Sequence, residues 1–530
     1  MRLLVPLTTA VLLAAPPAWA EPLLPDWMLP DWTLSGNLAA RAEIYDNFGD
    51  PAAAVFPDVG GQAFAEGFLR FDRRVSAFER FSGFASGVLN RSDYRSFNDG
   101  LVLERFQFDW EKGDASLPFK LTLGDSFAFF SPRSVQRSIK GAQLELQPGD
   151  GQGPHLTSIQ IFAGTDVPVY RDFDQPFTSY AGASALHQRA DGSSFIVNAV
   201  GAYRRADQAV EGLGQAVFTA AAEQPFEIGS HALTFEAEIG LFAGEHSVGQ
   251  GRAADIGLFS QLSGQSLDQR LSYRLLYERY GEDYQPFGAS IIPGRSSTEA
   301  HLAYRFDNGL VARGRAQRFI DGLEGANPTE SYVLGFGLTG PFLPEVGLAG
   351  SFDAFGRIAE DELGLRDEVS FTAQANLFAP IAEAWTGRAR LFVQTIDDRV
   401  QDDRFSTFEI DVSADHSFSA QDWRGIVSPG MRLRRITGGG GEAVELGPSI
   451  ALNTANGGHS VQISYSLLAQ MRLSTGAEDQ LNHQLAAAYT FRSGRHRFGV
   501  DGSLTTRNPE TGLPSNSVRA GVFYRYDFHR

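Results

Sequence analysis

The segment from Ser517 to Phe528 strongly constrains the fold, because it alternates apolar and polar residues over a membrane-spanning length. Its sequence is SVRAGVFYRYDF, and one face holds Val518, Ala520, Val522, Tyr524, Tyr526 and Phe528. Such alternation predicts a β-strand with one apolar and one wet face, and aromatic residues ending the apolar face suit a lipid–water interface. Because an open sheet would leave this strand as an exposed edge, we predict that it closes a transmembrane barrel. The residues expected on the closing strand are Val522, Tyr524, Tyr526 and Phe528.

The same alternation recurs along the chain from Trp32 onward. Val369 to Leu377 and Val461 to Met471, for example, each place apolar side chains at every second position. Counting such segments predicts an all-β fold, namely a single large transmembrane antiparallel up-and-down β-barrel of about 24 to 26 strands. A soluble all-β protein of many short strands is the alternative, but the segments exceed the usual strand length in soluble sheets.

The N-terminus predicts export from the cytoplasm. Residues 1–20, MRLLVPLTTAVLLAAPPAWA, combine a basic residue, an apolar run and a final Ala-Trp-Ala. This pattern is typical of a cleaved secretory signal peptide. We therefore expect a signal peptide over 1–20, a short periplasmic lead-in over 21–31, and the barrel over 32–530. The expected location is the bacterial outer membrane.

The composition favours neither enzymatic chemistry nor nucleic-acid binding. The chain contains no cysteine and has a formal net charge of −18, so it offers neither thiolate metal ligands nor a basic excess to neutralise phosphates. Gly124-Asp125-Ser126-Phe127 resembles the nucleophile block of a lipase/esterase family, but no Asp-x-x-His with the required spacing follows. We therefore predict a protein that is not an enzyme, with no catalytic residue, no metal site, no cofactor and no nucleic-acid partner.

Residues 121–146, LTLGDSFAFFSPRSVQRSIKGAQLEL, carry a local resemblance to a known family. The Gly-Asp pair, the following loop and the basic residue and glycine at Lys140-Gly141 resemble the early barrel strands of fimbrial ushers. The chain as a whole is similar to Gram-negative outer-membrane β-barrel proteins. The resemblance to ushers implies a large translocating barrel; the chaperone-binding, plug and C-terminal domains of ushers have no counterpart here, and no residue role is carried over.

Arginines recur on the face that the alternation assigns to the barrel lumen. One interpretation is a basic stripe that attracts an anionic substrate. The other is cross-strand pairing with lumen acids, namely Glu236, Glu238, Glu368, Glu409 and Asp411. The sequence leaves both open. The pore-lumen candidates are Arg270, Arg274, Arg305, Arg313, Arg315, Arg388, Arg390, Arg432 and Arg434.

The size of the barrel leads to the functional hypothesis. Barrels of 16–18 strands leave an aqueous channel and barrels of 22 are plugged, so about 26 strands require something to fill the bore. We predict a conduit or translocation channel for a large or anionic substrate, working with a partner. The expected partners are outer-membrane lipid, the barrel-assembly machinery, and a periplasmic protein, lipoprotein or plug. The alternatives are a general diffusion porin and a surface-display or adhesion scaffold.

Overall fold

The computed structural model describes residues 31–51, 54–94, 100–148, 157–172, 177–205, 212–246, 251–438, 441–473, 479–510 and 513–529. The predicted signal peptide and residues 21–30 of the lead-in lie outside these ranges. The described residues form 26 strands and two short 3-10 helices. No helix among them is long and apolar enough to span a membrane.

The first thirteen strands are β1 (Thr33–Gly49), β2 (Gly60–Arg74), β3 (Glu79–Arg91), β4 (Gly100–Lys112), β5 (Phe119–Ser131), β6 (Val135–Leu146), β7 (Ser158–Thr165), β8 (Thr178–Gln188), β9 (Ser194–Arg204), β10 (Leu213–Ile228), β11 (His231–Gly244), β12 (Ala253–Ser266) and β13 (Leu271–Tyr280). The others are β14 (Arg295–Arg305), β15 (Val311–Asp321), β16 (Thr329–Leu343), β17 (Leu348–Asp361), β18 (Asp367–Ala382), β19 (Trp385–Asp398), β20 (Asp403–Ala420), β21 (Trp423–Gly438), β22 (Gly441–Asn456), β23 (His459–Arg472), β24 (Gln480–Ser493), β25 (His496–Pro509) and β26 (Ser515–His529). The helices are η2 (Tyr170–Asp172) and η3 (Pro344–Val346).

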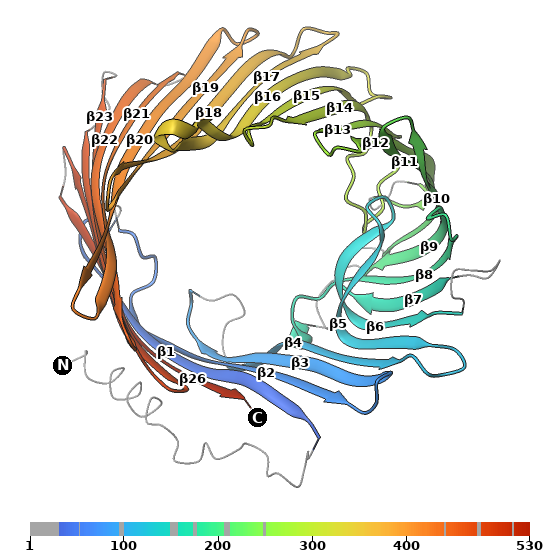
Figure 1. Ribbon diagram of the computed structural model, residues 1–530, viewed down its shortest axis with the longest axis horizontal. Coiled ribbons are helices and arrows are strands. Elements are labelled where there is room, and N and C mark those ends of the chain that lie inside the picture. The colour runs from blue at the N-terminus through green and yellow to red at the C-terminus, as the bar shows by residue number, and fades with distance from the viewer. Residues whose placement is uncertain are drawn as a thin grey trace.

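The strands form one closed antiparallel barrel. Each strand pairs with the next in sequence, and β26 returns to pair with β1 over fifteen residue pairs, from Ser35 opposite His529 to Gly49 opposite Ser515. Figure 1 shows the resulting ring, with β1 and β26 side by side. The predicted all-β, up-and-down barrel is confirmed, and the 26 strands fall at the upper end of the predicted range.

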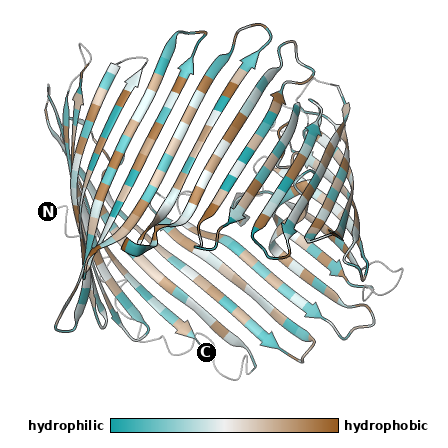
Figure 2. Ribbon diagram, turned by 45° about the horizontal axis from the view of Figure 1, so that its top comes forward, coloured by the Kyte–Doolittle hydropathy of each residue, from teal (hydrophilic) through white to brown (hydrophobic). Residues whose placement is uncertain are grey.

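The two faces of the wall differ in polarity as the alternation predicts. Large apolar side chains that point outward stay exposed in the isolated chain, including Phe218 at 57%, Leu302 at 52% and Leu334 at 69%. Figure 2 shows hydrophobic and hydrophilic residues alternating along the strands. Exposed apolar residues that alternate with polar ones around a closed barrel are explained by hydrocarbon contact.

Aromatic rings gather on the outer face at the end of the barrel where the chain begins. Trp32 lies against Phe71, whose ring centroid is 6.3 Å from that of Phe108, and Phe81 stacks on Trp110 at 5.7 Å. Aromatic side chains tolerate both apolar and polar surroundings, so they are enriched where a membrane protein meets the lipid headgroups. This row of rings therefore marks one edge of the apolar band.

Most turns at this end of the barrel are short. Arg189 and Ser193 close one hairpin through a backbone hydrogen bond, with Gly192 at a φ of +84°. Phe306 and Leu310 close another with Gly309 at +83°. Glycine suits both positions because it adopts positive φ without a steric penalty. Several connections at the opposite end are longer, such as residues 281–294 and 322–328. In the first of these, Tyr284 is fully buried.

Candidate functional site in the barrel interior

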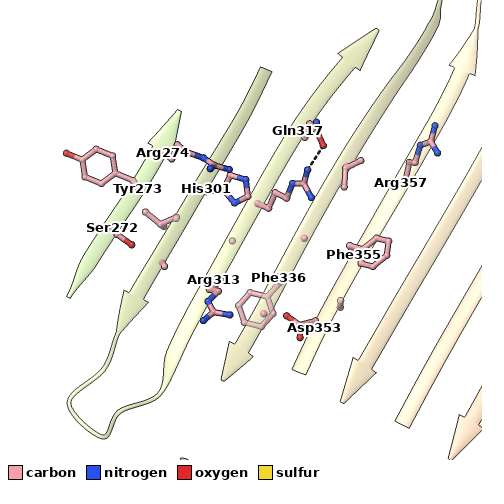
Figure 3. Close-up of a pocket in the computed structure, with 18 of the residues that line it drawn as sticks. Ser272, Tyr273, Arg274, His301, Arg313, Gln317, Phe336, Asp353, Phe355 and Arg357 are labelled. Atoms are coloured by element: carbon pink, nitrogen blue, oxygen red, sulfur yellow. Dashed lines mark hydrogen bonds between the residues drawn. The ribbon is translucent and has the colours of Figure 1, made fainter. Parts of the chain in front are cut away.

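A buried carboxylate organises the interior wall over β13 to β15. Glu299 accepts hydrogen bonds from Arg274 at 2.9 Å and Arg315 at 2.7 Å, and the His301 ring nitrogen lies 2.5 Å from it. The register brings these groups together, because Arg274 and Arg315 both lie opposite His301 on the same face. Figure 3 shows Arg274 and His301 side by side on neighbouring strands. The carboxylate offsets part of the positive charge of this cluster.

A second ion-pair network covers β19 to β22. Glu409 lies 3.2 Å from Arg390 and 3.6 Å from Arg434, and Arg434 also reaches Glu445 at 3.5 Å. Further contacts join Asp411 to Arg432 at 2.7 Å and to Arg390 at 3.6 Å, and Arg388 to Asp415 at 2.5 Å. Acids and guanidinium groups thus alternate from strand to strand, so the charges are closely balanced.

The other three predicted pore-lumen arginines lie elsewhere. Arg270 belongs to the turn between β12 and β13, where it pairs with Asp307 at 2.6 Å, and Arg305 ends β14 beside this turn. Arg313 forms no ion pair with any residue that the structure describes. It lines a cavity of about 1140 Å³, together with Arg315 and Asp353 (Figure 3). Six of the nine arginines therefore belong to two paired clusters and two lie at a barrel rim, where only Arg270 has an ion pair among the described residues. Arg313 lies in the cavity without one.

The barrel closes on a four-residue charge network. Arg41 of β1 bonds Glu43 at 2.6 Å and Asp501 of β25 at 2.8 Å, and Arg519 of β26 bonds the same two acids at 2.8 and 2.6 Å. The four residues predicted for the closing strand project from the other face of β26. Val522, Tyr524, Tyr526 and Phe528 lie opposite Ala42, Ala40, Leu38 and Gly36 respectively.

The strongest departure from a regular barrel is the hairpin made by the ends of β5 and β6. Strand pairing between β4 and β5 stops at Gly124, and pairing between β6 and β7 stops at Lys140. Gly124 has a φ of +92°, a conformation that residues with a Cβ rarely adopt. Beyond it, residues 125–139, here named the inner hairpin, leave the wall. Figure 1 shows this hairpin inside the ring.

One face of the inner hairpin packs against the interior wall. Ala128 and Ile139 form a buried apolar cluster with Phe162 of β7, Tyr180 of β8 and Val200 of β9. Apolar burial contributes about 25 cal/mol per Å² removed from water. This contact therefore stabilises the hairpin in its inward position.

The tip of the inner hairpin is fixed to the wall by polar contacts. Glu238 of β11 accepts hydrogen bonds from Ser131 at 2.6 Å and Arg133 at 3.1 Å. The Arg133 guanidinium lies 3.4 Å from the ring centroid of Phe259. In the loop after β13, burial raises the pKa of Tyr284, so its hydroxyl stays protonated and donates to the Arg133 carbonyl at 3.0 Å.

Side chains replace the missing strand pairing at the base of the hairpin. Asp125 accepts hydrogen bonds from Lys140 at 2.6 Å and from the Phe106 backbone N–H at 2.6 Å, and Lys140 also donates to the Glu104 carbonyl. The Tyr170 hydroxyl of η2 lies 3.1 Å from both Asp125 and the Phe106 carbonyl. We call Asp125, Lys140 and Tyr170 the hinge cluster. Burial, followed by the charge of Asp125, raises the pKa of Tyr170.

The hinge cluster gives the Gly-Asp-Ser motif a structural role. Asp125 accepts a hydrogen bond from the Phe106 N–H of β4, which has no strand partner beyond Gly124. The Ser126 hydroxyl is buried without a hydrogen-bond partner among the described residues. No base therefore lies in place to activate Ser126 there. The sequence predicts Glu238 to be a lumen acid that pairs with an arginine, but sequence reasoning missed that its partner is Arg133, and it missed the role of Tyr170. A usable signal was the run Phe127-Ala128-Phe129-Phe130, which is apolar on both faces and so breaks the alternation of a lipid–water wall.

A closed barrel with an apolar outer face and a polar interior is the architecture of an integral protein of the bacterial outer membrane, and the chain is one of these proteins.

No family model matches the chain, and no curated protein matches it. Among solved structures it is similar to the siderophore receptor PirA from Pseudomonas aeruginosa, at 10% identity over 93% of this chain and 80% of that chain with a TM-score of 0.45. It is also similar to OccK11 (OpdR) from Pseudomonas aeruginosa, at 13% identity over 62% and 91% with a TM-score of 0.35. The P pilus usher (PapC) translocation pore aligns at 12% identity over 93% and 99% with a TM-score of 0.30. The likeness concerns the β-barrel fold.

Proposed function

We propose that this outer-membrane channel is a conduit for a large substrate, and that it works with a partner that occupies or closes the bore. The observation that carries the proposal is the closure of 26 strands around a polar interior. The diameter of a barrel grows with strand number, and natural barrels of 22 strands already hold a plug. A wider barrel would leak small solutes unless its bore is occupied during use.

The inner hairpin supports this proposal. It narrows the bore from the side of β7 to β12 and is fastened at its base and at its tip. A hairpin fixed on one side reduces the cross-section of the bore but leaves one continuous passage. Such a passage suits an elongated substrate. The paired interior arginines suit a structural role, and Arg313 is the candidate for direct contact with an anionic substrate.

The test is single-channel recording of the purified mature barrel in a planar bilayer, with neutral polymers of graded size added to one side. We expect a conductance well above that of a diffusion porin, and entry of polymers that a porin excludes. A small, steady current with a porin-like size limit would overturn the proposal in favour of a general diffusion porin. An adhesion scaffold would be identified instead if the barrel conducted no current and if cleaving its outer loops abolished the binding of a surface ligand.

A further inference from the structure

The inner hairpin presents two aromatic rings to the barrel interior. Phe127 and Phe129 alternate with Ala128, whose side chain packs against the wall, so the two rings point the opposite way, toward the bore. Their centroids are 6.3 Å apart and their planes differ by only 10°. The side chains are 53% and 46% exposed. Hydrocarbon cannot explain this exposure, because the hairpin lies inside the ring (Figure 1).

Uncharged polar groups lie beside these rings. The register of the hairpin places Ser138 opposite Phe127 and Gln136 opposite Phe129, and both polar residues are exposed. Cross-strand partners lie on the same face of a hairpin, close enough to contact one ligand. The face therefore offers two flat apolar surfaces, one hydroxyl and one amide. We call Phe127, Phe129, Gln136 and Ser138 the ring platform.

A second pair of rings lies on the interior wall itself. Phe68 of β2 lies opposite Asn37 of β1, which is on the same face of β1 as the interior residue Arg41, so Phe68 also faces the interior. Its ring stacks on that of Phe84 of β3, with the centroids 6.1 Å apart. The Arg105 guanidinium lies 5.0 Å from the Phe84 centroid. Parallel aromatic pairs thus occur both on the hairpin and on the wall of β2 and β3. A repeated feature suits a ligand with repeated units.

We infer that the ring platform binds neutral sugar units of a saccharide chain as that chain passes through the barrel. The faces of aromatic rings are electron-rich, so they attract the polarised C–H groups on the flat side of a pyranose. Gln136 and Ser138 can meet the ring hydroxyls. A lipid chain would need an apolar surface without polar groups, and a charged peptide would need ion partners on the platform. This inference rests on the proposed conduit function and specifies its substrate class.

The experiment measures block of the open-channel current of the full barrel by maltohexaose, a neutral oligosaccharide. We expect transient blocks in the native protein and residence times about fivefold shorter for each ring removed. The variants are F127L and F129L, which keep the apolar character and remove the flat face, alone and together. F195L is the matched control, because Phe195 is 50% exposed on a strand face outside the platform.

The outcomes separate the inference from the conduit proposal. Blocks that shorten in F127L/F129L and persist in F195L support the platform. A wide channel that maltohexaose never blocks, or blocks that the leucine pair leaves unchanged, would overturn the platform while leaving the conduit intact. Equal block by a glycine–serine peptide of similar length, with the same dependence on the two rings, would overturn the assignment to sugars. A native barrel without a wide conductance would overturn the conduit itself.

Discussion

At the scale of single residues, the hinge cluster shows how one buried cation substitutes for strand pairing. The Lys140 side chain is 4% exposed and bonds both Asp125 and the Glu104 carbonyl. Replacing it by methionine keeps an unbranched side chain one atom shorter and removes the charge. The Asp125 carboxylate would then lose its cation while remaining largely buried.

We predict that K140M lowers the free energy of unfolding by about 3 kcal/mol, because breaking a buried ion pair leaves an uncompensated charge. Denaturant unfolding measures this change, with the heat-dependent mobility of the barrel on a mild gel as the readout of the folded fraction. K120M is the control, since Lys120 pairs with Glu111 at a surface where both side chains are over 40% exposed. Its expected cost is under about 1 kcal/mol. Equal stability of K140M and the native protein would refute a stabilising role for the hinge cluster.

The turn of the hairpin away from the wall depends on Gly124. Besides its φ of +92°, a Cβ at this position would lie 2.2 Å from the Phe106 carbonyl oxygen. We predict that G124A destabilises the barrel by at least about 2 kcal/mol, from backbone strain and from the clash. G314A is the matched control, because Gly314 is also in a strand and a Cβ there would meet no atom within 4 Å. Thermal unfolding compares the two, and similar midpoints would contradict the prediction.

At the scale of elements, contacts at its tip hold the inner hairpin against the interior wall at β11. Glu238 is the central acceptor, and its side chain is only 5% exposed. We predict that R133M loosens the tip without releasing it, because the methionine cannot bond Glu238 while the bonds of Ser131 and Tyr284 remain. Breaking a buried pair costs about 3 to 5 kcal/mol. The measurement is the noise of the open-channel current, which should rise as the hairpin moves in the bore.

R435M serves as the control for this prediction, because Arg435 bonds Glu442 at an exposed position away from the hairpin. Its current should match that of the native channel. If R133M were equally quiet, the Arg133 side chain would be dispensable, and the bonds that Ser131 and Tyr284 make at the tip, with the apolar contact of Ala128 and Ile139, would be sufficient to hold the hairpin.

The inner hairpin is a segment whose path the sequence pattern did not predict. Period-two alternation predicts the strands because lipid and water impose opposite demands on the two faces of every wall segment. Inside the barrel, residues 125–139 meet protein on one face and the bore on the other, so alternation no longer reports orientation. The pairing of Glu238 with Arg133, over a hundred positions apart in sequence, has no local signal. The resemblance of residues 121–146 to ushers drew attention to the right segment without revealing its path.

At the scale of the whole molecule, the net charge of −18 contrasts with an interior in which most predicted pore-lumen arginines face an acid. Arg274 and Arg315 share Glu299, and Arg390 and Arg434 share Glu409. Paired charges at such distances largely cancel beyond about 10 Å in physiological salt. The field that a diffusing ion meets in the bore is therefore weak, despite the acidity of the chain.

We predict that the native channel discriminates weakly between anions and cations, and that removing interior acids makes it prefer anions. The variant E299Q/E409Q leaves four guanidinium groups with fewer partners, so its reversal potential in a potassium chloride gradient should move toward that of chloride. E330Q is the control, because Glu330 pairs with Arg318 outside both interior networks. A native channel that already selects anions strongly would show that the acids do not balance the interior. The basic-stripe interpretation of the arginines would then be preferred to the structural one, with Arg313 as the first residue to substitute.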